Sequence, residues 1–117
     1  MSTDVVDKIA EQTIPVKKTS LTFSKAIELG EYEPNFLEQF PEFSELTRPS
    51  QYEYVKKAIE NRIKHIWVHW SELANLPDMS IKPQIRKAME KLEQQHKKVM
   101  ADKERLYIEF ASSDINR

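Results

Sequence analysis

Three histidines are the residues of this sequence best suited to acid–base or metal chemistry near neutral pH. His65 and His69 are four residues apart, so both would lie on one face of a helix. His96 on a facing helix and Glu72 could complete a zinc set. However, the position between the two histidines where a zinc protease carries its glutamate is isoleucine, and the nearby charge of Arg62 would repel a cation. We therefore expect no metal or other cofactor, and histidines that donate to neighbouring carboxylates or carbonyls.

The sequence lacks the residues on which common catalytic centres depend. Nucleophile elbows, phosphate loops and glycine-rich turns need glycine, and Gly30 is the only one in 117 residues. There is no cysteine to act as a nucleophile, to form a disulfide or to bind metal as a thiolate. The glutamates lie in stretches that we expect to be solvated, where burial would not raise the pKa of a general acid. We expect a protein that is not an enzyme.

The absence of cysteine also fits a reducing compartment, so a cytoplasmic location is expected. No apolar run approaches the roughly 20 residues of a membrane span. The first residues, MSTDVVDKIAEQ, carry acids where a signal peptide would need a basic and then an apolar stretch. We therefore expect a chain that is neither secreted nor inserted in a membrane.

The fold is expected to be organised around one long helix, from about Ser50 to Ala74. Its start has two interpretations: Thr47 is the cap with Pro49 in the first turn, or Ser50 and Glu53 form a capping box. Apolar residues recur at steps of three and four, which predicts one core-facing stripe: Tyr52, Val55, Ile59, Ile63, Ile66, Trp70 and Leu73. Both tryptophans, Trp67 and Trp70, lie in its last third, so we expect that end to anchor the fold and Trp70 to be a core residue.

A second long helix is predicted from about Ile81 to Phe110. A connection of about five residues after Asn75 favours an antiparallel return. Apolar residues repeat every seven positions at Ile85, Leu92, Val99 and Leu106, and four residues after each come Met89, His96, Lys103 and Phe110. This helix is longer than its partner by roughly one to two turns, so it is expected to overhang from about Leu106. Residues 111–117 are expected to be a frayed tail.

The N-terminal third is predicted to add short helices to a single all-α domain of residues 20–110. Residues 1–19 are expected to be a loosely held arm, with a helical possibility at Asp4–Gln12. A helix over Thr22–Leu29 follows, with Ser20 or Thr22 as its cap and Gly30 at its end. Residues 32–46 are expected to form two short turns opened by Pro34 and Pro41. Their interleaved aromatic and acidic residues are also typical of a recognition segment, but we favour the core, since three phenylalanines are unlikely to lie in water.

Charge is unevenly distributed although the formal net charge is only -1. Residues 28–45 are acidic and residues 82–98 are mainly basic, so the two segments are expected to face each other or to be solvated. Lys91 and Lys98 could track phosphates along the last helix, which makes nucleic-acid binding the alternative function. Lys98 has Asp102 one turn away, as in an ordinary solvated helix, whereas Lys91 has no such neighbour.

These patterns together predict a long antiparallel helical hairpin capped by short N-terminal helices. Such a shape offers surface rather than a pocket, so we expect a non-catalytic protein–protein interaction or regulatory module whose partner is another protein. A homodimer is expected through the overhanging apolar strip of Leu106, Tyr107 and Phe110. In the competing arrangement, the N-terminal arm or residues 36–46 cover this strip within one chain.

Overall fold

The computed structural model of the protein describes residues 21–77 and 82–115. Within these residues the chain forms helices and no strand, so the predicted all-α class is confirmed. The helices in chain order are α3 (Phe23–Leu29), α4 (Pro34–Leu37), α5 (Pro41–Ser44), α6 (Arg48–Ala74) and α7 (Lys82–Ile115). The expected arm of residues 1–19 lies outside the described residues.

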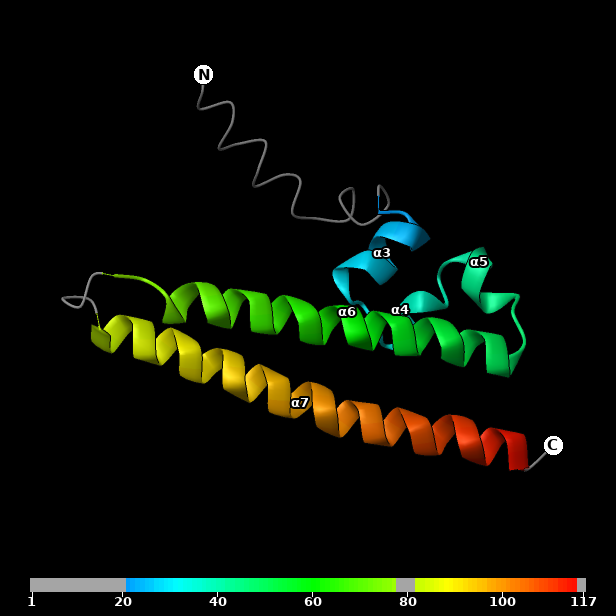
Figure 1. The fold of residues 1–117 in the computed structure, drawn as a ribbon. Coiled ribbons are helices and arrows are strands. Elements are labelled where there is room, and N and C mark those ends of the chain that lie inside the picture. Colours follow the sequence, from blue (N-terminus) through cyan, green and yellow to red (C-terminus); the bar gives the residue numbers. More distant parts are fainter. Residues whose placement is uncertain (1–20, 78–81, 116–117) are drawn as a thin grey trace, which may run out of the picture.

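The long helices α6 and α7 lie side by side as the predicted antiparallel hairpin (Figure 1). The seam is apolar: Val55, Ile59 and Ile66 of α6 and Leu92, Val99 and Leu106 of α7 are buried. Burial of this stripe stabilises both helices far more than their intrinsic propensities do.

The ends of the long helices refine the sequence-based boundaries. The Thr47 hydroxyl accepts a 3.4 Å hydrogen bond from the Ser50 amide, which selects the first of the two interpretations of where α6 begins. Helix α7 continues to Ile115, five residues beyond the end at Phe110 that the sequence predicted. Neither glycine nor proline follows Phe110, and therefore nothing in the sequence breaks the helix there.

Helix α3 packs against α6 and is closed at both ends by local signals. The Thr22 hydroxyl accepts a 3.1 Å hydrogen bond from the Lys25 amide, and Gly30 ends the helix at φ 87°, as predicted. The carbonyl groups at this end are satisfied by α6: Asn61 donates to Ile27, and Arg62 donates to Gly30. These bonds fix both the position and the direction of α3.

The short helices α4 and α5 begin at Pro34 and Pro41, as predicted, and they contribute to the core. Leu37 and Phe43 are fully buried, which confirms the core interpretation of residues 32–46 over the recognition segment. The side-chain amide of Gln51 donates a buried 2.9 Å hydrogen bond to the Phe43 carbonyl and so joins α5 to α6. The N-terminal layer of α3, α4 and α5 therefore belongs to the same core as the hairpin.

The core is centred on the first two thirds of α6 and not on its tryptophan end. Val55, Ala58 and Ile59 are almost completely inaccessible to solvent, whereas Trp70 is only half-buried and Trp67 is 39% exposed. The expectation that the tryptophans anchor the fold was therefore wrong. The physical reason is that α3, α4 and α5 lie along the first part of α6 and leave its last turns uncovered in the described structure (Figure 1).

The molecule is elongated and thin. Its Cα atoms have a radius of gyration of 18.0 Å and extend 57 × 36 × 16 Å. A compact domain of roughly 100 residues would have a radius of gyration near 13 Å. A large part of the hairpin is therefore surface. Among residues 21–77 and 82–115, no helix is long and apolar enough to cross a bilayer.

Candidate interaction surfaces

The three histidines do not converge on one point. The Nε2 atom of His65 lies 3.0 Å from the carbonyl oxygen of Glu28; a carbonyl only accepts, so the ring donates. This is the carbonyl bond that the sequence led us to expect. The His96 ring instead packs against Trp67, with 4.9 Å between ring centroids. In the part of the chain that the structure describes, no three His, Cys, Asp or Glu residues are grouped as a metal site would require.

The two lysines of the nucleic-acid alternative, Lys91 and Lys98, differ in their contacts. Lys98 Nζ lies 2.7 Å from the Asp102 carboxylate, which confirms the pairing expected from their spacing, while Lys91 is exposed. The acidic segment does not pair with the basic one as a block. Glu31 and Glu33 instead reach Arg62 and Arg105, at 3.7 Å and 2.8 Å.

The expected dimerisation strip is not an exposed surface. Leu106 is fully buried and Phe110 is 4% exposed; only Tyr107, at 57%, is open to solvent. The Phe110 ring lies 5.1 Å from that of Tyr52, and the Arg48 guanidinium sits 4.0 Å above it. The strip does not overhang because the register of the hairpin places Phe110 beside Tyr52, in the second turn of α6.

A polar cluster that the sequence did not reveal ties the N-terminal layer to α7. The Tyr32 hydroxyl donates a 2.6 Å hydrogen bond to Asp102, whose carboxylate also accepts from Lys98 and Arg105. Arg105 in turn donates to Glu33 at 2.8 Å. Spacing predicts only its Lys98–Asp102 pair, because Tyr32 and Glu33 lie about 70 residues from Asp102 and Arg105 and meet them only after the hairpin closes.

Electrostatics of the cluster follow from its burial and its hydrogen bonds. Burial of the Asp102 carboxylate would raise its pKa, but hydrogen bonds from Lys98, Tyr32 and Arg105 outweigh burial and hold the pKa below its ordinary value. Burial first, and then the hydrogen bond to Asp102, raise the pKa of the Tyr32 hydroxyl above its ordinary value. Both shifts arise from contacts within the chain, which tie the N-terminal layer to α7.

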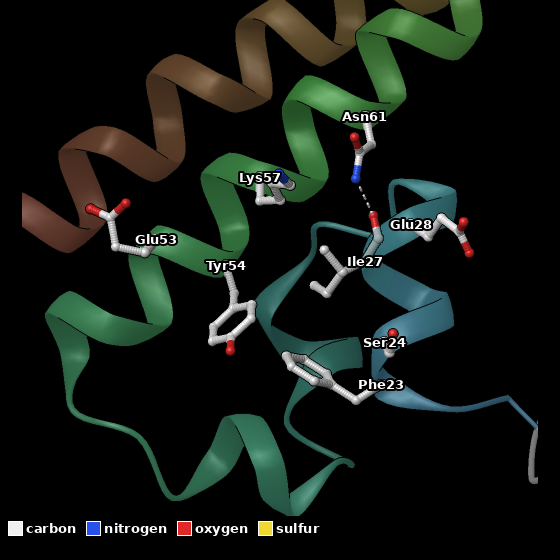
Figure 2. Close-up of a pocket in the computed structure, with 8 residues that line it drawn as sticks. All are labelled: Phe23, Ser24, Ile27, Glu28, Glu53, Tyr54, Lys57 and Asn61. Atoms are coloured by element: carbon white, nitrogen blue, oxygen red, sulfur yellow. Dashed lines mark hydrogen bonds between the residues drawn. The ribbon is translucent and has the colours of Figure 1, made fainter.

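A shallow groove separates α3 from the middle of α6 (Figure 2). Its walls are Phe23 and Ile27 of α3 and Tyr54 of α6, and the Asn61–Ile27 hydrogen bond lies at one end. The Phe23 and Tyr54 rings meet edge to face with centroids 5.0 Å apart, so they partly fill the space between the helices. The charged side chains of Glu28, Glu53 and Lys57 also line the groove.

The opposite flank of the hairpin carries a second surface. The N-terminal layer contacts one flank of each long helix, through Ala58 and Arg62 in α6 and through Asp102 and Arg105 in α7. The other flank presents side chains spaced at four and seven residues along each helix, which places them in two adjacent rows. We call this surface the open face; it comprises Lys56, Ile63, Trp67, His96, Met100 and Tyr107.

Ring contacts show that residues of the open face on each helix touch the other helix. Trp67 packs on His96, and the Tyr107 ring lies 6.2 Å from that of Tyr52. Trp67 and Met100 are each 39% exposed, and Tyr107 is 57% exposed. Sequence analysis identified Tyr107 but assigned it to a strip with two residues that are buried. The spacing of His96, Met100 and Tyr107 was the signal that could have identified the correct row.

No protein-family model, curated protein or solved structure matches this chain. The surfaces of the chain itself are therefore the basis for assigning a function.

Proposed function

We propose that this protein is a non-catalytic interaction module whose open face binds a helical segment of a protein partner. The observation that carries the proposal is the one-sided cover of the hairpin: the N-terminal layer covers one flank, while Trp67, Met100 and Tyr107 lie uncovered on the other. An exposed apolar row framed by charged residues is typical of a protein-binding surface.

The shape of the open face supports a helical partner in particular. Two helices that lie side by side leave a long shallow furrow between their rows of side chains, and a third helix fills such a furrow with its own ridge. Aromatic and methionine side chains such as Trp67, Tyr107 and Met100 are enriched in protein-binding surfaces because they bury a large area and adapt to a partner. An extended peptide would have no free strand edge with which to pair among the described residues.

The other candidate surfaces of the protein are partly satisfied by contacts within the chain, which is consistent with regulation through the open face. The Tyr32–Asp102 cluster is satisfied within the chain, and the groove of Figure 2 is shallow and partly filled by its own rings. Lys98, one of the two lysines of the nucleic-acid alternative, already pairs with Asp102. A cytoplasmic location stays a prediction from the composition.

The proposal is tested by placing a photoreactive amino acid at Met100 and, in a matched variant, at Leu29. Met100 and Leu29 are exposed to similar extents, 39% and 43%, but Leu29 lies on α3, away from the open face. After illumination of cells that make the protein, we expect a discrete cross-linked product from Met100 that is much stronger than any from Leu29. Adding Trp67→Glu should remove it, because a charge would be buried in the interface. Equal cross-linking from both positions, or none from Met100, would refute the proposal.

A further inference from the structure

We infer that the helical partner of the open face is a second copy of this chain, in an antiparallel two-fold dimer that forms a four-helix bundle. The inference rests on the proposed function and names the partner of the same surface. It replaces the dimer expected through Leu106 and Phe110, which are buried inside the chain.

Contacts between the two helices fix the level at which a two-fold axis would cross the hairpin. Tyr52 meets Phe110 near one end, and Trp67 meets His96 towards the other. Counting along both helices from these contacts places Ile63 and Met100 at the same level, near the middle of the open face. A two-fold axis that lies in the plane of the interface at this level, perpendicular to the helices, places each helix antiparallel to the same helix of the second copy.

Charged residues beside the open face are arranged so that the two-fold rotation places opposite charges next to each other. Glu60 of α6 and Glu104 of α7 lie on the Tyr52 side of the axis level. The next charges of the same rows, Lys64 and Lys97, lie on the Trp67 side, one and two turns along their helices. The two-fold rotation sets Glu60 near Lys64 of the second copy, and Glu104 near Lys97 of the second copy. Such pairing favours the antiparallel dimer over the parallel one, in which like charges would meet.

Lys56 and the two tryptophans are also placed so that the two-fold rotation brings them together. Lys56, whose ammonium already lies 5.5 Å from the Tyr52 ring, is on one side of the axis level, and the Trp67–Trp70 pair is on the other. The rotation carries Lys56 over the tryptophan pair of the second copy, where a cation and an aromatic face attract each other. The indole of Trp67 thereby gains a lysine ammonium in addition to the Trp70 and His96 rings that it contacts in its own chain.

The area available is sufficient for a stable dimer. Helix α6 has 27 residues and is therefore about 40 Å long, and two helices side by side are about 20 Å wide. The flank of the hairpin that carries the open face thus measures about 800 Å² in projection, comparable to the area that each partner buries in a standard protein interface. The formal net charge of -1 opposes association only weakly.

The dimer is tested with two charge-reversed proteins of full length. The first carries Glu60→Lys and Glu104→Lys, and the second carries Lys64→Glu and Lys97→Glu. By sedimentation velocity at about 100 µM, we expect the wild type to be a dimer and each variant to be a monomer, because like charges then meet across the axis. An equimolar mixture of the two variants should recover the dimer. A control with Glu42→Lys and Glu45→Lys, exposed on the N-terminal layer, should remain dimeric.

Three outcomes would overturn the inference: a monomeric wild type, variants that each remain dimers, or a mixture that stays monomeric. Helical circular dichroism and thermal melting of each variant identify any that fails to fold, and exposed Lys→Gln and Glu→Gln versions then replace it. If the wild type is a monomer but still cross-links to a different protein at Met100, the second copy is refuted and the proposed function stands. If the monomer also gives no cross-link, both fail.

Discussion

The hydroxyl of Tyr32 and the carboxylate of Asp102 form a 2.6 Å hydrogen bond that joins positions 70 residues apart. Tyr32 follows α3 and Asp102 lies in α7. This bond therefore connects the N-terminal layer directly to α7 and holds the layer on the hairpin. Only 8% of Tyr32 is exposed, and burial strengthens a hydrogen bond to a charged acceptor. This contact keeps one flank of the hairpin covered and so distinguishes it from the open face.

Removing the Tyr32 hydroxyl tests this tether. Tyr32→Phe should lower the free energy of unfolding by about 1.5 kcal/mol, near the lower end for bonds to charged groups, because Lys98 and Arg105 still satisfy Asp102. Tyr54→Phe is the matched control, since 41% of Tyr54 is exposed and it lies outside the open face. Urea unfolding of both variants measures the difference. Equal losses from the two would show that the Tyr32 bond adds nothing to stability.

The lowered pKa of Asp102 predicts a pH dependence of stability. Because the folded-state pKa lies below the unfolded value near 3.8, the charged carboxylate stabilises the fold above that pH. Its contribution is lost as the pH falls through the unfolded and then the folded pKa. The stability difference between wild type and Asp102→Asn should therefore be constant from about pH 7 to pH 5 and shrink below about pH 4. Denaturant unfolding at each pH measures this difference, and an increase in acid would contradict the assignment.

Gly30 is predicted to be irreplaceable for two independent reasons. Its φ of 87° is disfavoured for any side chain, and an added Cβ would lie 2.8 Å from Arg62 Cα and 2.9 Å from Arg62 N. Gly30→Ala should cost at least about 1–2 kcal/mol of stability from the backbone conformation alone. Arg62→Ala should not rescue it, because the clash includes backbone atoms. A thermal melt in which the double variant recovers the stability of Arg62→Ala would disprove this explanation.

Core and open positions should respond very differently to the same truncation. Ile59 is 2% exposed at the seam, and Ile108 is 59% exposed on α7. Ile59→Ala should cost about 2–5 kcal/mol of unfolding free energy because it leaves a cavity, whereas Ile108→Ala should change it by less than about 0.5 kcal/mol. Chemical denaturation measures the unfolding free energy of the two variants, each of which replaces an isoleucine by alanine. A similar loss at both positions would mean that the seam is not packed as described.

Features set by neighbours in the sequence were predictable, and features set by register were not. The Thr22 cap, the Gly30 stop and the seven-residue repeat of α7 depend on residues a few positions apart. The burial of Leu106 and Phe110 depends on the register between α6 and α7, which places Phe110 beside Tyr52 and His96 beside Trp67.

The candidate site was harder to predict than the fold for the same reason. Periodicity shows which side of α6 packs, but it does not show how far the N-terminal layer extends along that helix, so the exposure of Trp67 was missed. The Tyr32–Asp102 bond requires three helices to be placed correctly before the two groups meet.

Oxidation of single-cysteine variants tests most directly whether the open face is an interface between two copies. The chain has no cysteine, so Met100→Cys and Tyr54→Cys each introduce one thiol, at sites 39% and 41% exposed. A disulfide forms only if two Cα atoms approach to within about 7 Å, which the two-fold axis allows at Met100 and not at Tyr54 on the covered flank. On mild oxidation, Met100→Cys should give a covalent dimer in non-reducing electrophoresis while Tyr54→Cys remains a monomer. A dimer from Tyr54→Cys alone, or the same small yield from both, would contradict the assignment of the open face.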